Sequence, residues 1–285
     1  MTIYISTGGF KSEPASKSVI KLINYGAKNI ELSGGTYSST NIKRLSLLKK
    51  KISFQIHNYF PPPRDPFVFN LASQDKLITQ RSIKHVKNAL EYCKKLNASY
   101  YSFHAGFLCD IKVSELGKKI EKKKLYNRKK SISIFLKRIK KLSVLAKKNK
   151  ITLLVENNVL SLKNKTEFRG NPLLMCDPEE TLKIAKQFPT NVKLLIDVAH
   201  LKVSAKTLRF DPQMMFRKCK EYIGGYHLSD NDGKSDSNSV FTNKAWFWKY
   251  LNKDLDYFSV EVYNLNKKKF SNLKKIILKK LNKSF

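Results

Sequence analysis

Short apolar runs alternate with longer amphipathic segments along the whole chain. The short runs are typical of buried β-strands, and the segments between them carry apolar residues at helical spacing. We predict strands at Thr2–Ser6, Asn29–Leu32, Ser53–Ile56, Tyr100–Phe103, Thr152–Val155, Lys193–Ile196, Gly225–His227 and Phe258–Val262. We predict helices at Ala15–Tyr25, Ile42–Lys49, Leu77–Leu96, Leu125–Lys148, Pro178–Phe188, Pro212–Cys219, Phe241–Leu251 and Phe270–Leu281. The pattern therefore gives eight strands, each followed by one helix.

Regular alternation of this kind predicts parallel strands joined by helical crossovers. A doubly wound open sheet would also alternate, but eight units in 285 residues match the closed (β/α)8 barrel. The doublets Gly8-Gly9 and Gly34-Gly35 do not form a Gly-x-Gly-x-x-Gly motif, which disfavours dinucleotide binding. We expect the fold class α/β, as a (β/α)8 TIM barrel. Because no linker, repeat or low-complexity segment divides the chain, we expect one domain over residues 1–285.

The connections that follow the strands are long, whereas several connections from helix to strand are short. The long ones are Asn58–Ser73, Ala105–Lys124, Asn157–Asp177, Val198–Asp211 and Leu228–Val240. They place the long loops at the carboxyl ends of the strands, the face where barrel enzymes carry their sites. The first of them is rich in proline and aromatic residues, which suits either sugar stacking or a packed cover over the barrel mouth. The loop Asn157–Asp177 is long enough to act as a lid.

Each of the last six predicted strands has a residue of metal-ligand type at its carboxyl end. In chain order they are His57, His104, Glu156, Asp197, His227 and Glu261. An ionisable group at the end of a buried strand needs a partner, since an isolated charge there is costly. A further histidine, His200, follows Asp197 by three residues, whereas His85 lies in a predicted helix and is assigned no role.

Two glutamates, one aspartate and one histidine converging on one point suit a divalent cation. Carboxylate-rich ligation favours Mn²⁺ or Mg²⁺, and the imidazole keeps Co²⁺ and Zn²⁺ open. The cysteines Cys93, Cys109, Cys176 and Cys219 form no metal-binding cluster, which argues against a structural zinc site. We therefore predict a divalent metal site at the barrel mouth, with the identity and number of the ions left open.

The strand-end motifs make the chain resemble the xylose-isomerase-like TIM-barrel superfamily over essentially its whole length. This superfamily includes sugar isomerases, ketose 3-epimerases and zinc-dependent abasic-site endonucleases. The resemblance is carried by Phe103-His104-Ala105-Gly106, Val155-Glu156-Asn157-Asn158, Ile196-Asp197-Val198-Ala199-His200, His227-Leu228-Ser229-Asp230-Asn231-Asp232-Gly233 and Val260-Glu261-Val262. Five such pieces in order are specific for the superfamily and much less specific for a substrate.

The epimerase-like members imply a metal held by Glu156, Asp197, His227 and Glu261. By the same resemblance, Glu156 and Glu261 would exchange a proton at a substrate carbon through an enediolate. We expect His57, His104 and His200 to contact the substrate. Lys234, in the loop after His227, is expected to bind a phosphate or hydroxyl group, although a solvated lysine is the alternative.

The endonuclease-like members imply three zinc ions and a larger ligand set. Here the Asp-x-His pair that those members carry after the seventh strand is replaced by Asp236-Ser237-Asn238. An amide oxygen is a poor zinc ligand, so this departure disfavours three-metal cleavage of a phosphodiester. A metal-dependent sugar isomerase or epimerase is therefore our leading hypothesis. The alternatives are an abasic-site endonuclease, and a related lyase, hydrolase or non-catalytic binding barrel.

The net charge of +34 is the most conspicuous feature of the composition, and it suggests nucleic acid. However, only eight of the 56 basic residues are arginine, the residue whose forked guanidinium recognises bases and phosphates. We interpret the charge chiefly as a compositionally biased, solvated surface, with polyanion binding as the alternative. We expect a small carbohydrate as the binding partner and favour nucleic acid less. By resemblance to the superfamily, many of whose members form dimers or tetramers, a homo-oligomer is an open alternative.

The cellular setting is predicted from the start of the chain and from the cysteines. Met1–Ser6 lacks the basic segment and apolar stretch of a signal peptide, and no apolar run is long enough to cross a bilayer. The scattered cysteines fit a reducing compartment. We expect a cytoplasmic protein with no membrane association.

Overall fold

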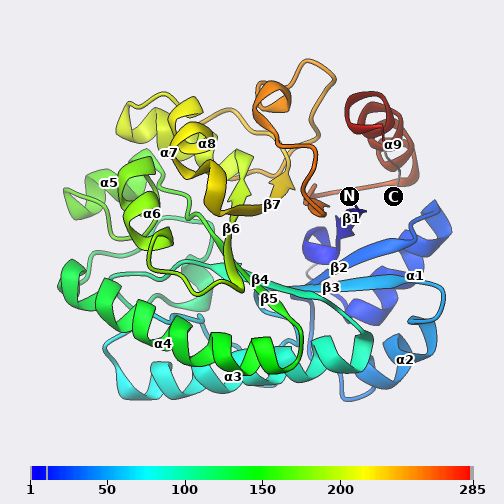
Figure 1. The fold of residues 1–285 in the computed structure, drawn as a ribbon, viewed down its shortest axis with the longest axis horizontal. Coiled ribbons are helices and arrows are strands. Elements are labelled where there is room, and N and C mark those ends of the chain that lie inside the picture. Colours follow the sequence, from blue (N-terminus) through cyan, green and yellow to red (C-terminus); the bar gives the residue numbers. More distant parts are fainter. Residues whose placement is uncertain (1, 11, 283–285) are drawn as a thin grey trace.

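Eight parallel strands close into a barrel, and helices surround it (Figure 1). The structure is a computed structural model and describes residues 2–10 and 12–282. Each strand pairs with its sequence neighbours, and β1 pairs with β8 to close the ring. The strands are β1 (Thr2–Ser6), β2 (Asn29–Ser33), β3 (Ser53–His57), β4 (Tyr100–His104), β5 (Thr152–Glu156), β6 (Val192–Asp197), β7 (Ile223–Leu228) and β8 (Tyr257–Val260). The predicted (β/α)8 fold class is confirmed, whereas the assignment of the chain to one domain stays a prediction.

The outer ring consists of α-helices that begin and end at local signals in the sequence. Asp75 caps the start of α3 by accepting from the backbone N–H of Ile78, and Asn97 ends the same helix in the left-handed conformation. The helices are α1 (Ala15–Tyr25), α2 (Asn41–Leu48), α3 (Lys76–Leu96), α4 (Arg128–Lys148), α5 (Leu162–Phe168), α6 (Pro178–Ala185), α7 (Val198–Leu208), α8 (Gln213–Cys219) and α9 (Lys267–Leu281). Short 3-10 turns are η1 (Thr7–Gly9), η2 (Val113–Glu115), η3 (Lys220–Tyr222) and η4 (Trp248–Tyr250).

The prediction of one helix after each strand is wrong in three places. The connection predicted as a loop from Asn157 to Asp177 contains helix α5. The connection predicted as a loop from Val198 to Asp211 is mostly helix α7, which Asp197 caps directly at the end of β6. The helix predicted at Phe241–Leu251 is an irregular segment that contains only η4. Aromatic rings of this segment pack against one another, with the ring centroids of Phe247 and Trp248 4.9 Å apart. Their burial is therefore achieved without a helical face.

The two faces of the barrel wall bury different kinds of residue. Side chains that point outward, such as Ile3, Ile30 and Val155, join the main apolar core against the helices. A smaller cluster inside the barrel consists of Tyr4, Leu154, Leu195 and Tyr257, with Tyr100 packed against it. Above this inner cluster the barrel interior is polar, and Glu31, Gln55 and Ser102 are buried there. This interior leads to the carboxyl ends of the strands.

The loops over that face are anchored by buried polar side chains. The amide nitrogen of Asn158 lies 2.9 Å, 3.2 Å and 2.9 Å from the carbonyl oxygens of Ala105, Gly106 and Leu174. In the proline-rich loop after β3, Phe60 and Phe67 are both buried. The structure therefore favours the packed cover over the sugar-stacking surface for these two rings. Within the described ranges, no helix has the length and apolar character needed to cross a membrane.

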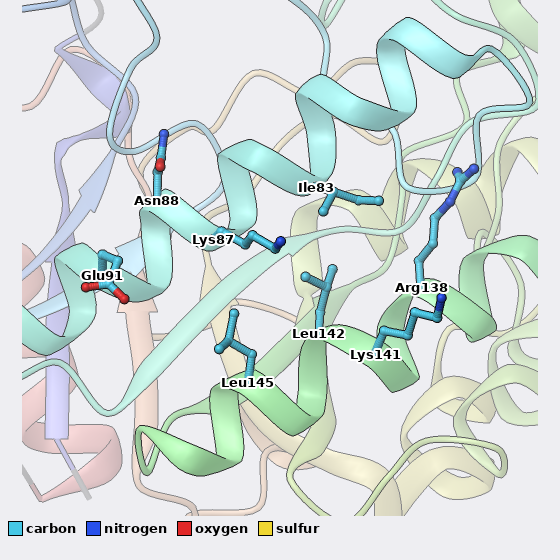
Figure 2. A pocket seen from close by; sticks show the side chains of 8 residues that line it. All are labelled: Ile83, Lys87, Asn88, Glu91, Arg138, Lys141, Leu142 and Leu145. Carbon is cyan, nitrogen blue, oxygen red and sulfur yellow. The ribbon is translucent and has the colours of Figure 1, made fainter.

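A groove of about 560 Å³ lies between α3 and α4 on the outside of the barrel (Figure 2). Its floor contains Ile83, Leu142 and Leu145, and Lys87 and Arg138 also line it. All its lining residues come from these two helices, and none is a strand-end residue. The chemistry predicted at the strand ends is therefore separate from this groove.

Candidate metal centre

Strand register brings the predicted strand-end residues to one point. His104 on β4 lies directly beside Glu156 on β5, and Asp197 on β6 lies directly beside His227 on β7. Partners in a parallel ladder project to the same face of the sheet, so these side chains share the inside of the barrel mouth. Glu261 follows β8 and completes the ring.

Glu156 is the centre of the cluster, and every other member of it except Asp197 and Glu261 contacts its carboxylate. Its Oε1 lies 3.2 Å from His227 Nδ1 and 3.5 Å from His200 Nδ1. Its Oε2 lies 3.4 Å from His104 Nδ1 and 3.6 Å from His57 Nε2. Each oxygen of one buried carboxylate therefore faces two imidazoles.

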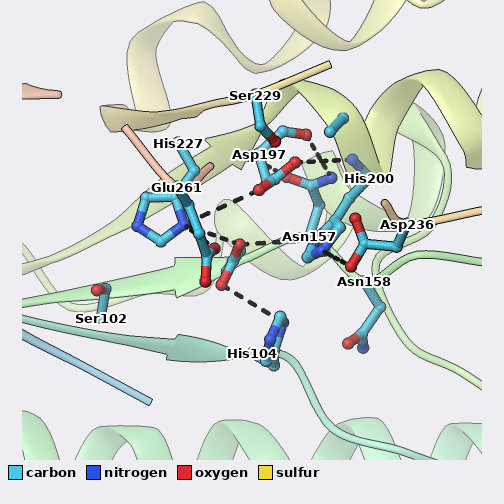
Figure 3. Close-up of polar contacts among 12 residues, drawn as sticks. Ser102, His104, Asn157, Asn158, Asp197, His200, His227, Ser229, Asp236 and Glu261 are labelled. Carbon is cyan, nitrogen blue, oxygen red and sulfur yellow. Dashed lines mark hydrogen bonds and ion pairs between the residues drawn. The ribbon is translucent and has the colours of Figure 1, made fainter. Parts of the chain in front are cut away.

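His227 connects this carboxylate to two more (Figure 3). Its Nδ1 lies 3.4 Å from Glu261 Oε2 and 3.9 Å from Asp197 Oδ2. Two groups of residues have potential ligand atoms that all lie within 4.8 Å of one another: His57, Glu156, His227 and Glu261, and His104, Glu156 and His200. Asp197 belongs to neither group and borders the first through His227. Glu156 belongs to both groups, so it is placed to bridge two positions.

The donor atoms of this cluster lack partners of the usual kind. Both oxygens of Glu156, Asp197 Oδ2 and His227 Nδ1 are buried without a well-aligned hydrogen-bond partner among the described residues. Buried charged oxygens without partners cost several kcal/mol in general, and a cation at the same point would compensate them. Glu156, Asp197 and His227 are 0% exposed, so solvent does not perform this role. The residues present therefore fit a divalent metal.

Electrostatic coupling changes the pKa of almost every group in the cluster. Burial, together with the carboxylates of Glu156 and Asp236, raises the pKa of Asp197 to about 7 against the opposing effect of His200. Burial alone would also raise the pKa of Glu156, but the nearby imidazoles, chiefly His104, hold it well below its usual range. Burial lowers the pKa of His104 to about 4. The pKa of the Asp197 carboxyl thus lies near neutrality, far above that of Glu156.

Asp236 reaches the cluster although it comes from the loop after β7. Its Oδ2 lies 3.2 Å from Nε2 of His200, while Nδ1 of His200 lies 3.0 Å from the carbonyl oxygen of Asn157. Burial alone would lower the pKa of His200, but Asp197 and Asp236 raise it well above its usual range. Asn238 faces a different partner, because its side-chain oxygen accepts from the hydroxyl of Ser229. The Asp-x-Asn pair therefore contributes only its carboxylate here.

Two further residues support the cluster from inside the barrel. The carboxylate of Glu31 on β2 accepts from Nε2 of His227 at 2.8 Å and also from the hydroxyl of Tyr257. Ser102 lies 2.9 Å from Nδ1 of His57. Glu31 was not among the predicted site residues, and its signal in the sequence was a lone acidic residue between the apolar Ile30 and Leu32 of a predicted strand.

The structure brings together all the predicted site residues except Lys234. That lysine is exposed, and its backbone N–H donates to Asp232 in its own loop. His85, which was assigned no role, is buried, and its Nε2 lies 2.9 Å from the carbonyl oxygen of Asn58. The roles assigned to the clustered residues stay predictions, whereas their convergence is a structural finding.

Comparisons with known proteins agree with this fold. Residues 21–262 match the family of the Xylose isomerase-like TIM barrel, and the chain belongs to that family. No curated protein matches the sequence.

Solved structures with the same fold cover nearly the whole chain. A D-tagatose 3-epimerase-like protein is 19% identical, with a TM-score of 0.73 over 99% of this chain and 98% of its own. The D-psicose 3-epimerase from Clostridium cellulolyticum H10 is 14% identical, with a TM-score of 0.64 over 99% and 96%. The IolI protein, solved with a bound zinc atom, is 14% identical, with a TM-score of 0.68 over 100% and 99%. At these identities the likeness establishes the fold alone.

Proposed function

We propose that the protein is a divalent-metal-dependent isomerase or epimerase that acts on a sugar or sugar phosphate. One observation carries this proposal: carboxylates from β5, β6 and the end of β8 converge on a single imidazole nitrogen, Nδ1 of His227. The oxygens of Glu156, Glu261 and Asp197 lie 3.2 Å, 3.4 Å and 3.9 Å from it. Membership of the family and the similarity to ketose 3-epimerase structures support the substrate class.

Glu156, Asp197, His227 and Glu261 are the residues that would hold the metal. Three carboxylates and one imidazole are a donor set for Mn²⁺, Mg²⁺, Co²⁺ or Zn²⁺. When bound, the metal would supply Lewis acidity toward a carbonyl or hydroxyl oxygen of the substrate. The buried, unpartnered oxygens of Glu156 and Asp197 support this assignment.

Glu156 and Glu261 are the groups we assign to proton transfer at the substrate carbon. A base must be ionised to accept a proton, and the imidazoles around Glu156 keep its pKa well below the usual range. Glu261 is 7% exposed and so lies nearer to solvent than Glu156, which is 0% exposed. His104 has a partly exposed side chain, and we assign it to substrate binding together with His57 and His200.

Solvent exchange tests this function directly. The metal-loaded protein is incubated in D₂O with a panel of ketoses and their phosphates, and deuterium at carbon is measured by NMR. We expect exchange with at least one sugar, and we expect Glu261→Gln to abolish it. Lys234→Ala should weaken the binding of a phosphorylated substrate and leave the binding of an unphosphorylated sugar unchanged. A metal-loaded protein that exchanges no proton in any sugar would reject the proposal.

A zinc-dependent abasic-site endonuclease is the second candidate, and the group His104, Glu156 and His200 favours it. This group shares Glu156 with the first one, and paired metal positions are common in enzymes that cleave phosphate esters. Asp236 lies beside His200 and could contribute to the second position. Two or three zincs per chain, with nicking of an abasic oligonucleotide that Glu261→Gln abolishes, would establish this candidate. One metal and no nicking would exclude it.

A further inference from the structure

Glu31 is a buried carboxylate that the proposed chemistry does not use. It lies in the middle of β2, is 0% exposed, and faces the interior of the barrel below the strand-end cluster. Its sequence neighbours Ile30 and Leu32 pack outward in the apolar core. A charge at such a position is destabilising unless a specific partner compensates it.

The partner of Glu31 is the far side of the His227 ring. Glu31 Oε2 lies 2.8 Å from Nε2 of His227, and the hydroxyl of Tyr257 donates to the same oxygen. A carboxylate only accepts, so Nε2 of His227 carries the hydrogen. Two donors on the same carboxylate oxygen, one of them an imidazole, favour the ionised form of Glu31.

This contact fixes which nitrogen of His227 is available to a metal. With the hydrogen on Nε2, the lone pair of the neutral ring lies on Nδ1. That nitrogen faces the carboxylates of Glu156 and Glu261, at 3.2 Å and 3.4 Å. The nitrogen of His57 that points away from Glu156 has the hydroxyl of Ser102 as its partner, and this hydroxyl carries no charge. Among the described residues, Glu31 is therefore the only anionic side chain hydrogen-bonded to the outer nitrogen of His57 or His227.

We propose that Glu31 is the positioning residue of the metal centre, which sets the tautomer of His227 and raises its affinity for the cation. This inference rests on the proposed metal-dependent function. An anion hydrogen-bonded to the outer nitrogen makes an imidazole a stronger ligand, and loss of such a partner weakens metal binding by about 10- to 100-fold. Glu31 touches neither the metal position nor the substrate, so it acts through His227.

The test compares metal affinity in wild type, Glu31→Gln and Tyr257→Phe, measured by competition between Co²⁺ or Zn²⁺ and a chelating dye. Glutamine keeps the size and an acceptor oxygen but removes the charge. We expect its dissociation constant to rise about 10- to 100-fold, with a changed visible spectrum of bound Co²⁺. Tyr257→Phe removes the other hydrogen bond to Glu31 and leaves the charge in place, so its affinity should change much less. Unfolding of the metal-free variants provides the control for folding.

Three results separate the outcomes. Wild-type affinity in a folded Glu31→Gln variant overturns the inference, and so does an equal loss in both variants, which would indicate a structural role. A wild-type protein that binds no divalent metal rejects the proposed function itself. If Glu31→Gln does not fold, the tautomer of His227 in the ¹⁵N-histidine NMR spectrum of the zinc-loaded wild type tests the inference instead. A hydrogen on Nε2 and zinc on Nδ1 of His227 supports the inference, and the reverse tautomer refutes it.

Discussion

A methyl group added at Gly8 should weaken the metal centre without unfolding the barrel. Gly8 lies in η1, directly after β1, and a Cβ atom there would lie 2.4 Å from Oε1 of Glu261 and 3.3 Å from the hydroxyl oxygen of Ser6. Gly8 does not have a positive φ, so alanine causes no backbone strain of that kind. The Gly8→Ala perturbation therefore acts on the carboxylate of Glu261.

The size of the effect follows from the distance. An ordinary contact of this type begins near 3.4 Å, so the carboxylate oxygen must move by about 1 Å. Metal–ligand distances tolerate only about 0.2 Å, so the displaced Glu261 would no longer meet the geometry of a ligand. Disturbing the surroundings of a metal ligand lowers affinity by about 10- to 100-fold, or ~1.4 to 2.8 kcal/mol.

The assay is metal affinity by dye competition, together with thermal unfolding of the metal-free protein. Gly170→Ala is the matched control, because it makes the same chemical change where the nearest atom to a new Cβ is 3.8 Å away. We expect weaker binding only in Gly8→Ala and nearly unchanged unfolding in both. Wild-type affinity in a folded Gly8→Ala protein would refute the reasoning that places Glu261 on the metal.

Three further predictions concern the cluster and its anchors. Glu156→Gln should remove bound metal altogether, because both ligand groups share this carboxylate, and full metal content by elemental analysis would contradict this. Metal affinity should rise with pH, because binding must displace a proton from His227. Burial alone would lower the pKa of His227, but Glu31 and Glu156 raise that pKa well above the usual range. Calorimetry in buffers of different ionisation enthalpy measures this release, and equal heats would argue against it. Asn158→Leu should lower the free energy of unfolding by at least ~2 kcal/mol, because it leaves buried carbonyl oxygens unpaired. Denaturant titration measures this loss, and Asn88→Leu at an exposed position is the control. Equal stability of the two variants would refute the prediction.

Strand order and the positions of the candidate ligands were accessible from the sequence because both are local patterns. An apolar run followed at once by His104, Glu156 or Asp197 is visible without any knowledge of the fold. The closed parallel topology then requires that the carboxyl ends of all strands meet, so convergence follows from the fold class. Helix α7 was missed because its start coincides with a strand end, where Asp197 serves as ligand candidate and helix cap together.

The supporting contacts of the site were decided only by the tertiary structure. Glu31 and His227 are 196 positions apart, and no local pattern connects a strand's central acid with a histidine on another strand. The same holds for Asp236, whose loop folds back onto His200, and for Gly8, whose missing side chain leaves room for Glu261.

The sequence by itself thus determined an eight-stranded barrel and the chemical types at its mouth, since hydrophobic period and strand ends are properties of neighbouring residues. Only the closed barrel decided which oxygen faces which nitrogen, which carboxylate bridges the two ligand groups, and which buried anion stands behind His227. Those relations arise from shear, register and loop packing around the ring, and these are set by contacts among residues far apart in the chain.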